Sequence, residues 1–135
     1  MDSTVPRSTI PVAVIIASEQ EPVKCDGVYA EHAGGFALEF SIHQDKFAIE
    51  HTAAKTKICT SGELSYDIEL SDKVSSVLLA TPFGKARFTV KTLDRTVQKS
   101  DDKLDISLRY ILSSEAAGDI ERFVDVTVLL PKKEV

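Results

Sequence analysis

The chain has 135 residues, which suits one domain, since chains of about 100–200 residues usually fold around a single core. Hydrophobic residues make up 43% of it and charged residues 27%, which argues against both disorder and a membrane span. The formal net charge is −5, and the basic residues are scattered rather than gathered in a stripe. Because nucleic acid and anionic membranes attract concentrated positive surface, we expect neither as a partner.

Two cysteines, Cys25 and Cys59, are too few for a disulfide framework and do not have the spacing of a metal site. Both fall in predicted strands, so one cross-strand bridge stays an alternative that depends on their separation in space. We expect two free, buried thiols and a cytoplasmic protein.

An apolar run at residues 10–17 superficially resembles a short signal sequence. Its leader carries Asp2 as well as Arg7, Pro11 interrupts the run, and its end makes a poor cleavage site. β-Branched residues dominate the run, so a first β-strand explains it better.

Alternation of apolar and polar residues predicts strands along most of the chain. Short polar breaks separate them, and tight turns are expected at residues 33–35 and 81–84 because glycine and proline favour such turns. We predict strands at residues 9–18, 23–32, 36–42, 47–60, 64–70, 74–80, 86–92 with a weaker extension through 97, 104–112 and 120–130.

Three segments interrupt this pattern. The alternation changes phase at residues 51–54, which indicates an irregular stretch or bulge near Ala53. Residues 113–119 are compatible with either a loop or one helical turn, which would end at Gly118. Gly27, inside the second predicted strand, indicates a bulge or bend.

About eight to ten strands joined by short turns predict an all-β protein, either a sandwich or a barrel. Hairpin-length connections favour an antiparallel up-and-down meander, and closing the meander removes its exposed edges. We therefore predict a β-barrel domain over residues 9–131, with tails at residues 1–8 and 132–135.

Three motifs carry a family resemblance. The block Ile58–Glu63, the turn Thr81–Gly84 and the run Leu104–Tyr110 together resemble the small bacterial family typified by YwiB, over about residues 23–130. The resemblance implies a calycin-like barrel with lipocalin-like architecture. It implies almost no chemistry, because that family is one of unknown function.

Three histidines were considered as metal ligands, together with Asp45 and Glu50. The sequence contains neither a His-x-His pair on a strand nor a His-x-x-x-His pair on a helix. We therefore expect no metal site and interpret the histidines as surface loop residues; they are His32, His43 and His51.

The sequence also lacks a catalytic constellation. Ser61 precedes Gly62 in what reads as a hairpin turn rather than a nucleophile elbow, and Gly34-Gly35 is not followed by a helix that could bind phosphate. Four carboxylates lie on alternating polar faces, where solvation explains them: Glu63, Asp67, Glu69 and Asp105. We expect no cofactor and no enzymatic activity.

Binding inside the barrel is the leading functional hypothesis. A barrel of about eight strands is just wide enough to be filled by its own side chains or to hold one small ligand. Inward tyrosines favour a ligand slightly, because their hydroxyls need partners, although a packed core explains the same pattern. The hypothesis is a small apolar or amphipathic ligand lined by Phe36, Phe40, Tyr66, Phe88 and Tyr110.

The alternative is a protein-interaction or structural module with a filled barrel, either a monomer or a weak homodimer. Val77 and Leu79 fall on the face opposite Val74 and Leu78, so this strand is apolar on both sides and could form a contact surface. The turn Thr81–Gly84 is interpreted as a structural corner.

Overall fold

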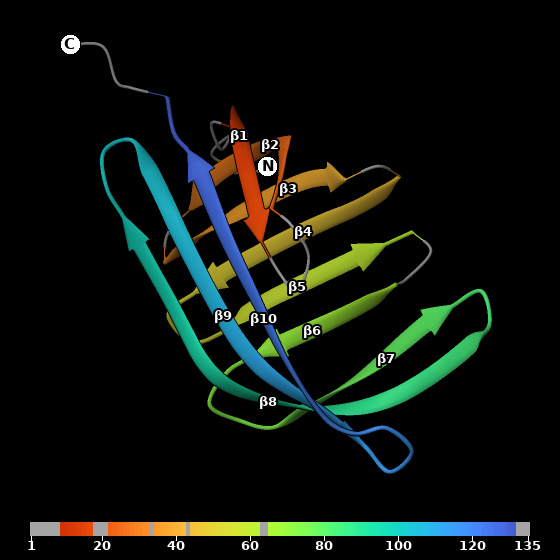
Figure 1. The fold of residues 1–135 in the computed structure, drawn as a ribbon. Helices are drawn as coiled ribbons and strands as arrows, with labels where there is room; N and C mark the ends of the chain where they lie inside the picture. The colour runs from red at the N-terminus through yellow and green to blue at the C-terminus, as the bar shows by residue number, and fades with distance from the viewer. Residues whose placement is uncertain (1–8, 18–21, 33, 43, 63–64, 132–135) are drawn as a thin grey trace, which may run out of the picture.

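The computed structural model describes residues 9–17, 22–32, 34–42, 44–62 and 65–131. Within these residues ten antiparallel strands form one sheet that curls into a nearly closed barrel, which confirms the predicted all-β fold (Figure 1). The strands are β1 (Thr9–Ala17), β2 (Val23–His32), β3 (Gly35–Ile42), β4 (Asp45–Thr52), β5 (Thr56–Ser61), β6 (Tyr66–Leu70), β7 (Ser75–Thr81), β8 (Gly84–Lys99), β9 (Lys103–Ser114) and β10 (Gly118–Leu129).

Neighbours in the chain are neighbours in the barrel, as an up-and-down meander requires. The sheet order is β6-β5-β4-β3-β2-β1-β10-β9-β8-β7, so the first and last strands pair with each other. Among the described residues, β6 and β7 share no ladder, and the backbone there is joined by an isolated bridge in which Ser65 and Ala80 exchange two hydrogen bonds of 2.9 Å. The Ser75 hydroxyl also donates to the Glu69 carbonyl at 2.9 Å. This sparsely bonded line is here called the seam.

Strand β8 is long and bent (Figure 1). Its first part pairs with β7 and its second part, from Thr89 to Lys99, pairs with β9. A register shift lies between Thr92 and Asp94. The weak extension predicted through residue 97 is strand apart from this irregularity, and it continues to Lys99.

Three local predictions need correction. The irregular stretch near Ala53 is a hairpin turn between β4 and β5, in which the Thr52 amide donates to the Lys55 carbonyl at 2.8 Å. Residues 113–119 form a hairpin between β9 and β10, so the helical turn is wrong. No bulge occurs at Gly27, which pairs regularly with residues of β1 and β3.

Close packing explains Gly27 instead. A Cβ atom at this position would lie 2.8 Å from the Glu39 carbonyl oxygen and 2.8 Å from Cγ2 of Val14. Real Cβ atoms do not approach other heavy atoms so closely, so a side chain here would force its neighbours to move.

The inner faces of the strands form one hydrophobic core. Val77 is 3% exposed, whereas Val74 and Leu78, on the other face, are 64% and 40% exposed. The most deeply buried side chains come from every strand pair around the barrel and include Val14, Leu38, Leu70, Leu108 and Val128. Side chains of the strands therefore fill the barrel interior.

The turn at Thr81–Gly84 is the predicted structural corner. The Phe83 amide donates to the Thr81 hydroxyl at 3.1 Å, and that hydroxyl donates to the Gly84 carbonyl at 3.0 Å. Lys85 and Arg87 are exposed on β8, as predicted. The described residues include no helix long and apolar enough to cross a membrane.

Candidate ligand pocket at one end of the barrel

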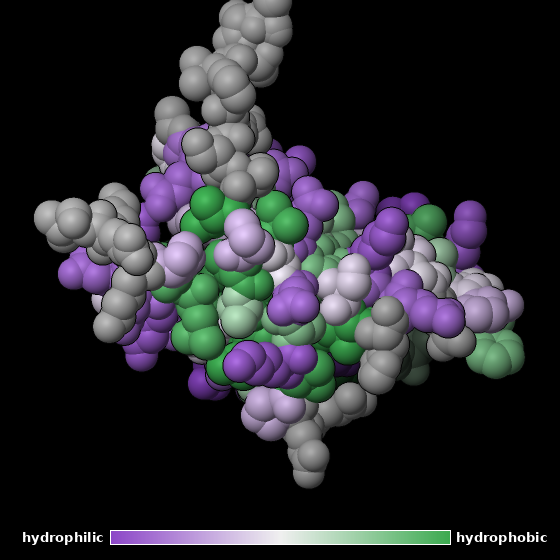
Figure 2. Space-filling model, turned by 90° about the horizontal axis from the view of Figure 1, so that it is seen from above, coloured by the Kyte–Doolittle hydropathy of each residue, from purple (hydrophilic) through white to green (hydrophobic). Residues whose placement is uncertain are grey.

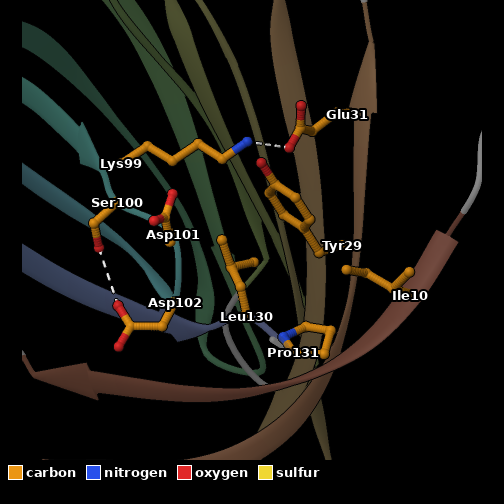
Figure 3. Close-up of a pocket in the computed structure, with 9 residues that line it drawn as sticks. All are labelled: Ile10, Tyr29, Glu31, Lys99, Ser100, Asp101, Asp102, Leu130 and Pro131. Carbon is orange, nitrogen blue, oxygen red and sulfur yellow. Dashed lines mark hydrogen bonds and ion pairs between the residues drawn. The ribbon is translucent and has the colours of Figure 1, made fainter. Parts of the chain in front are cut away.

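A pocket of about 890 Å³ opens at one end of the barrel (Figure 3). It lies where β1, β2 and the end of β10 meet the turn between β8 and β9. Its volume falls within the range of about 300–1,000 Å³ that is usual for small-molecule sites. The lining residues are Ile10, Tyr29, Glu31, Lys99, Ser100, Asp101, Asp102, Leu130 and Pro131.

One side of the pocket is apolar. Ile10 of β1 lies opposite Tyr29 of β2 in the ladder, and Leu130 and Pro131 follow β10. The Leu130 amide donates to the Asp102 carbonyl at 2.9 Å, which fixes this segment against the β8–β9 turn. Figure 2, which looks onto this end, shows hydrophobic surface bordered by hydrophilic side chains.

An ion pair crosses the opposite side. The Lys99 ammonium contacts the Glu31 carboxylate, and the two residues lie at the ends of β8 and β2, which are not neighbours in the sheet (Figure 3). The Tyr29 hydroxyl donates a hydrogen bond to the same carboxylate. Burial of the phenol, and then the negative charge of Glu31 and this hydrogen bond, raise the pKa of Tyr29 to about 12. The phenol therefore stays protonated and holds Glu31 at the pocket wall.

The β8–β9 turn supplies two further carboxylates. The Ser100 hydroxyl donates to Asp102 at 3.2 Å, whereas no hydrogen bond or ion pair joins the Asp101 side chain to another described residue. Figure 3 shows both carboxylates beside the pocket. Asp101 therefore offers the pocket a carboxylate that no described residue pairs with.

A row of rings runs from the pocket across the barrel interior. The ring centroids of Tyr29 and Phe36 are 5.7 Å apart, and those of Phe36 and His51 are 5.2 Å apart in a stacked arrangement. These residues lie on β2, β3 and β4. The row of packed rings thus links the pocket wall at Tyr29 to a second polar cluster around His51.

Arg95 organises that cluster. Its guanidinium donates to the Thr52 carbonyl at 3.0 Å, the Thr56 hydroxyl at 3.1 Å and the Ala53 carbonyl at 2.8 Å. Thr56 is fully buried and bonds Nδ1 of His51 at 2.7 Å. Burial, and then the charge of Arg95, lower the pKa of His51. When neutral His51 carries its proton on Nε2, its Nδ1 can accept a hydrogen bond from the Thr56 hydroxyl, which leaves the hydroxyl oxygen to accept from Arg95.

The five predicted lining residues have different surroundings. Phe36, Phe40 and Tyr110 are buried in the core at 5%, 4% and 4% exposure, and Tyr66 and Phe88 pack against it partly buried. None of the five lines the pocket at the barrel end. Their contact with a ligand stays a prediction.

The residues that line this pocket were not predicted as ligand contacts. Residues 98–102 read only as a polar loop, yet Arg95, Val97 and Lys99 keep the two-residue period of an inward face. That period could have placed Arg95 and Lys99 on the inside. The meeting of Lys99 with Glu31 depends on how the barrel curves, for which the sequence carries no local signal.

Histidine placement differs from the surface interpretation. His51 stacks on Phe36 inside the barrel, so it is not a surface loop residue. His32 lies in β2, and His43 and Glu63 lie outside the described residues. Among residues 9–17, 22–32, 34–42, 44–62 and 65–131, no three His, Cys, Asp or Glu side chains converge as a metal-binding group.

Both cysteines are free thiols, as predicted, but they are half-buried rather than buried. Burial, and then the charge of Asp26, raise the pKa of Cys25. Burial, and then a hydrogen bond to Asp67, raise the pKa of Cys59. Both thiols are therefore held protonated, which makes them weak nucleophiles.

These features define a class: a nearly closed, ten-stranded up-and-down β-barrel with a packed interior and a mixed polar and apolar pocket at one end. No family model matches the chain, and no curated protein matches it. Among solved structures, it is similar to the crystal structure of the YwiB protein from Bacillus subtilis, with a TM-score of 0.67 and 16% sequence identity over 92% of this chain and 91% of that chain. At this identity the likeness shows a shared fold, and it agrees with the YwiB-type barrel that the sequence resemblance predicted.

Proposed function

We propose that this protein binds a small amphipathic molecule in the pocket at the end of its barrel. The observation that carries the proposal is the pocket itself, which combines about 890 Å³ of open volume with an apolar side and a polar side. Ligand sites in proteins typically have this composition, because apolar surface provides affinity and a few polar groups fix orientation.

This ligand site lies at the end of the barrel, whereas the sequence predicted one in the barrel interior. The interior is packed with buried side chains, so a ligand there would have to displace core residues such as Leu38 or Leu108. At the barrel end, by contrast, Ile10 and Leu130 border open volume. A ligand can bury its apolar part against them without disturbing the core.

Direct binding measurements test the proposal. We expect native mass spectrometry of the protein purified from cells to detect a bound small molecule, and a thermal-shift screen with amphipathic lipids to raise the unfolding temperature. A ligand-free mass together with no stabilising compound would contradict the proposal.

Two neighbouring leucines provide a matched comparison for the site. Leu130 lines the pocket, whereas Leu129 is 38% exposed outside it. We expect Leu130→Ala to weaken binding of a screened ligand about fivefold, because apolar contact is lost, and Leu129→Ala to leave it unchanged. Equal effects of the two substitutions would place the ligand elsewhere.

A second candidate function is self-association through the β7–β8 hairpin. Two apolar side chains of the hairpin favour it, since Phe83 at the turn is 98% exposed and Leu78 of β7 is 40% exposed, whereas Val74, which is 64% exposed, lies at the other end of β7. Val77 is buried in the core and Leu79 packs against it, so this face of β7 does not contribute to the surface.

Mass in solution distinguishes the candidates. If two copies associate through this hairpin, Leu78→Lys with Phe83→Ser should convert a dimer into a folded monomer. A wild-type chain that is already monomeric at high concentration would rule out self-association.

A further inference from the structure

We infer that the polar group of the bound amphipath is a cation, such as a protonated amine. This inference rests on the proposed function, because it concerns the ligand of the same pocket. It is drawn from the charges that line the pocket and from the partners that each of them already has.

Negative charge dominates the lining. Glu31, Asp101 and Asp102 supply three carboxylates, and Lys99 supplies the one ammonium among the described lining residues. The ammonium is already paired with Glu31. The remaining carboxylates therefore set the sign of the field that a ligand meets.

An anionic headgroup would bind at a disadvantage. To reach the Lys99 ammonium it would have to displace Glu31, which would leave that carboxylate without its cation beside Asp101 and Asp102. Like charges brought together in this way raise the free energy of the complex. The ion pair across the pocket thus rejects anions rather than attracting them.

A cationic headgroup meets no such obstacle. Asp101 faces the pocket with no ion pair or hydrogen bond to another described residue, so it can accept a cation while every existing contact remains (Figure 3). The Ser100–Asp102 hydrogen bond holds the second carboxylate nearby. With the alkyl part against Ile10 and Leu130, the headgroup falls on the side of the pocket where the carboxylates are.

Three probes with the same eight-carbon chain test the inference: octylamine, octan-1-ol and octanoate, each titrated into the full-length protein at pH 7 and low salt. We expect octylamine to bind about fivefold to tenfold more tightly than octanoate, with octan-1-ol between them. Because the contact is partly exposed, raising the salt concentration should reduce the preference.

Asp101→Asn and Asp119→Asn form a matched pair. Asp119 lies in β10 by the β9–β10 turn, at the opposite end of β9 from the pocket, and it is exposed. We expect Asp101→Asn to reduce the preference for octylamine over octan-1-ol about threefold or more while leaving the unfolding temperature unchanged. Asp119→Asn should leave the preference intact.

The outcomes separate the two proposals. Octanoate binding as tightly as octylamine would overturn the cationic headgroup and leave the proposed pocket standing. Equal effects of the two substitutions would overturn the role of Asp101, because general attraction by the net charge of −5 would then explain the preference. Failure of all three probes to bind would count against both proposals.

Discussion

Arg95 connects strands that are not neighbours in the sheet, because its three hydrogen bonds join β8 to the β4–β5 hairpin. A lysine at this position would keep the positive charge. Its single ammonium could not reproduce all the hydrogen bonds that the two terminal nitrogens of the planar guanidinium donate. We expect Arg95→Lys to lower the free energy of unfolding by about 2 kcal/mol in urea denaturation. Arg109→Lys, an exposed position on β9, should change it little, and equal losses would contradict this role of Arg95.

The state of His51 should make stability depend on pH. Its pKa in the folded protein is lowered from 6.5, so the unfolded chain binds the proton more readily. The contribution of His51 is therefore complete above about pH 6.5 and is lost as the pH falls toward the folded pKa. The free energy of unfolding, measured by urea denaturation, should fall between pH 7.5 and pH 5.5. We expect this fall to be smaller for His51→Gln than for the wild type. A fall that is unchanged in His51→Gln would refute the prediction.

Two threonines on β5 are buried in different circumstances. Thr56 bonds His51 and Arg95, whereas no partner is found for the buried hydroxyl of Thr60 in the part of the chain that the structure describes. An unsatisfied buried hydroxyl costs stability, and valine has almost the same shape. We expect Thr60→Val to raise the free energy of unfolding by about 1 kcal/mol and Thr56→Val to lower it by a similar amount or more. The opposite order in thermal unfolding would contradict this.

Strands with a solvated face could be predicted well from the sequence. In β6, and in β9 from Lys103 to Tyr110, apolar and polar residues alternate without interruption, so element type and inward face were both correct. The predictions were wrong where two strands meet at a tight turn, as at residues 53–55. A break in the alternation of apolar and polar residues looks the same in the sequence for a bulge and for a hairpin turn. Backbone pairing, which the sequence does not display, distinguishes the two.

Gly27 shows how packing between strands constrains one position in β2. The added methyl of Gly27→Ala would meet Val14 and the Glu39 carbonyl, so we expect a loss of about 1–3 kcal/mol. Val14→Ala should relieve part of the clash. In a double-mutant cycle, the pair should therefore lose less stability than the sum of the single substitutions. Strict additivity would show that Val14 does not cause the cost.

At the scale of the whole molecule, closure brings together residues that no motif connects. Glu31 and Lys99 are 68 positions apart in the sequence and meet only because the sheet curves back on itself. The number of strands and their order followed from alternation and turn length, but the pocket depends on the relative positions of several strand ends. This is why aromatic residues of the core were predicted as lining, while the acidic β8–β9 turn was not.

The seam should be where the barrel opens first. Neighbouring strands elsewhere share continuous ladders, such as the one from Gly118 to Leu129 between β10 and β9, whereas β6 and β7 share the Ser65–Ala80 bridge and one side-chain bond from Ser75. Local opening begins where few hydrogen bonds must break. We expect hydrogen exchange to reach β6 and β7 before β9, and Ser75→Ala to accelerate it there about fivefold.

The pocket should remain intact when the seam opens. Its lining comes from β1, β2, the end of β8, the β8–β9 turn and the segment after β10, all on the continuously paired side of the barrel. Ser75→Ala should therefore speed exchange at the seam without weakening octylamine binding. Faster exchange at β1 and β10, or weaker binding in this variant, would instead mean that the barrel opens where its first and last strands meet, next to the pocket.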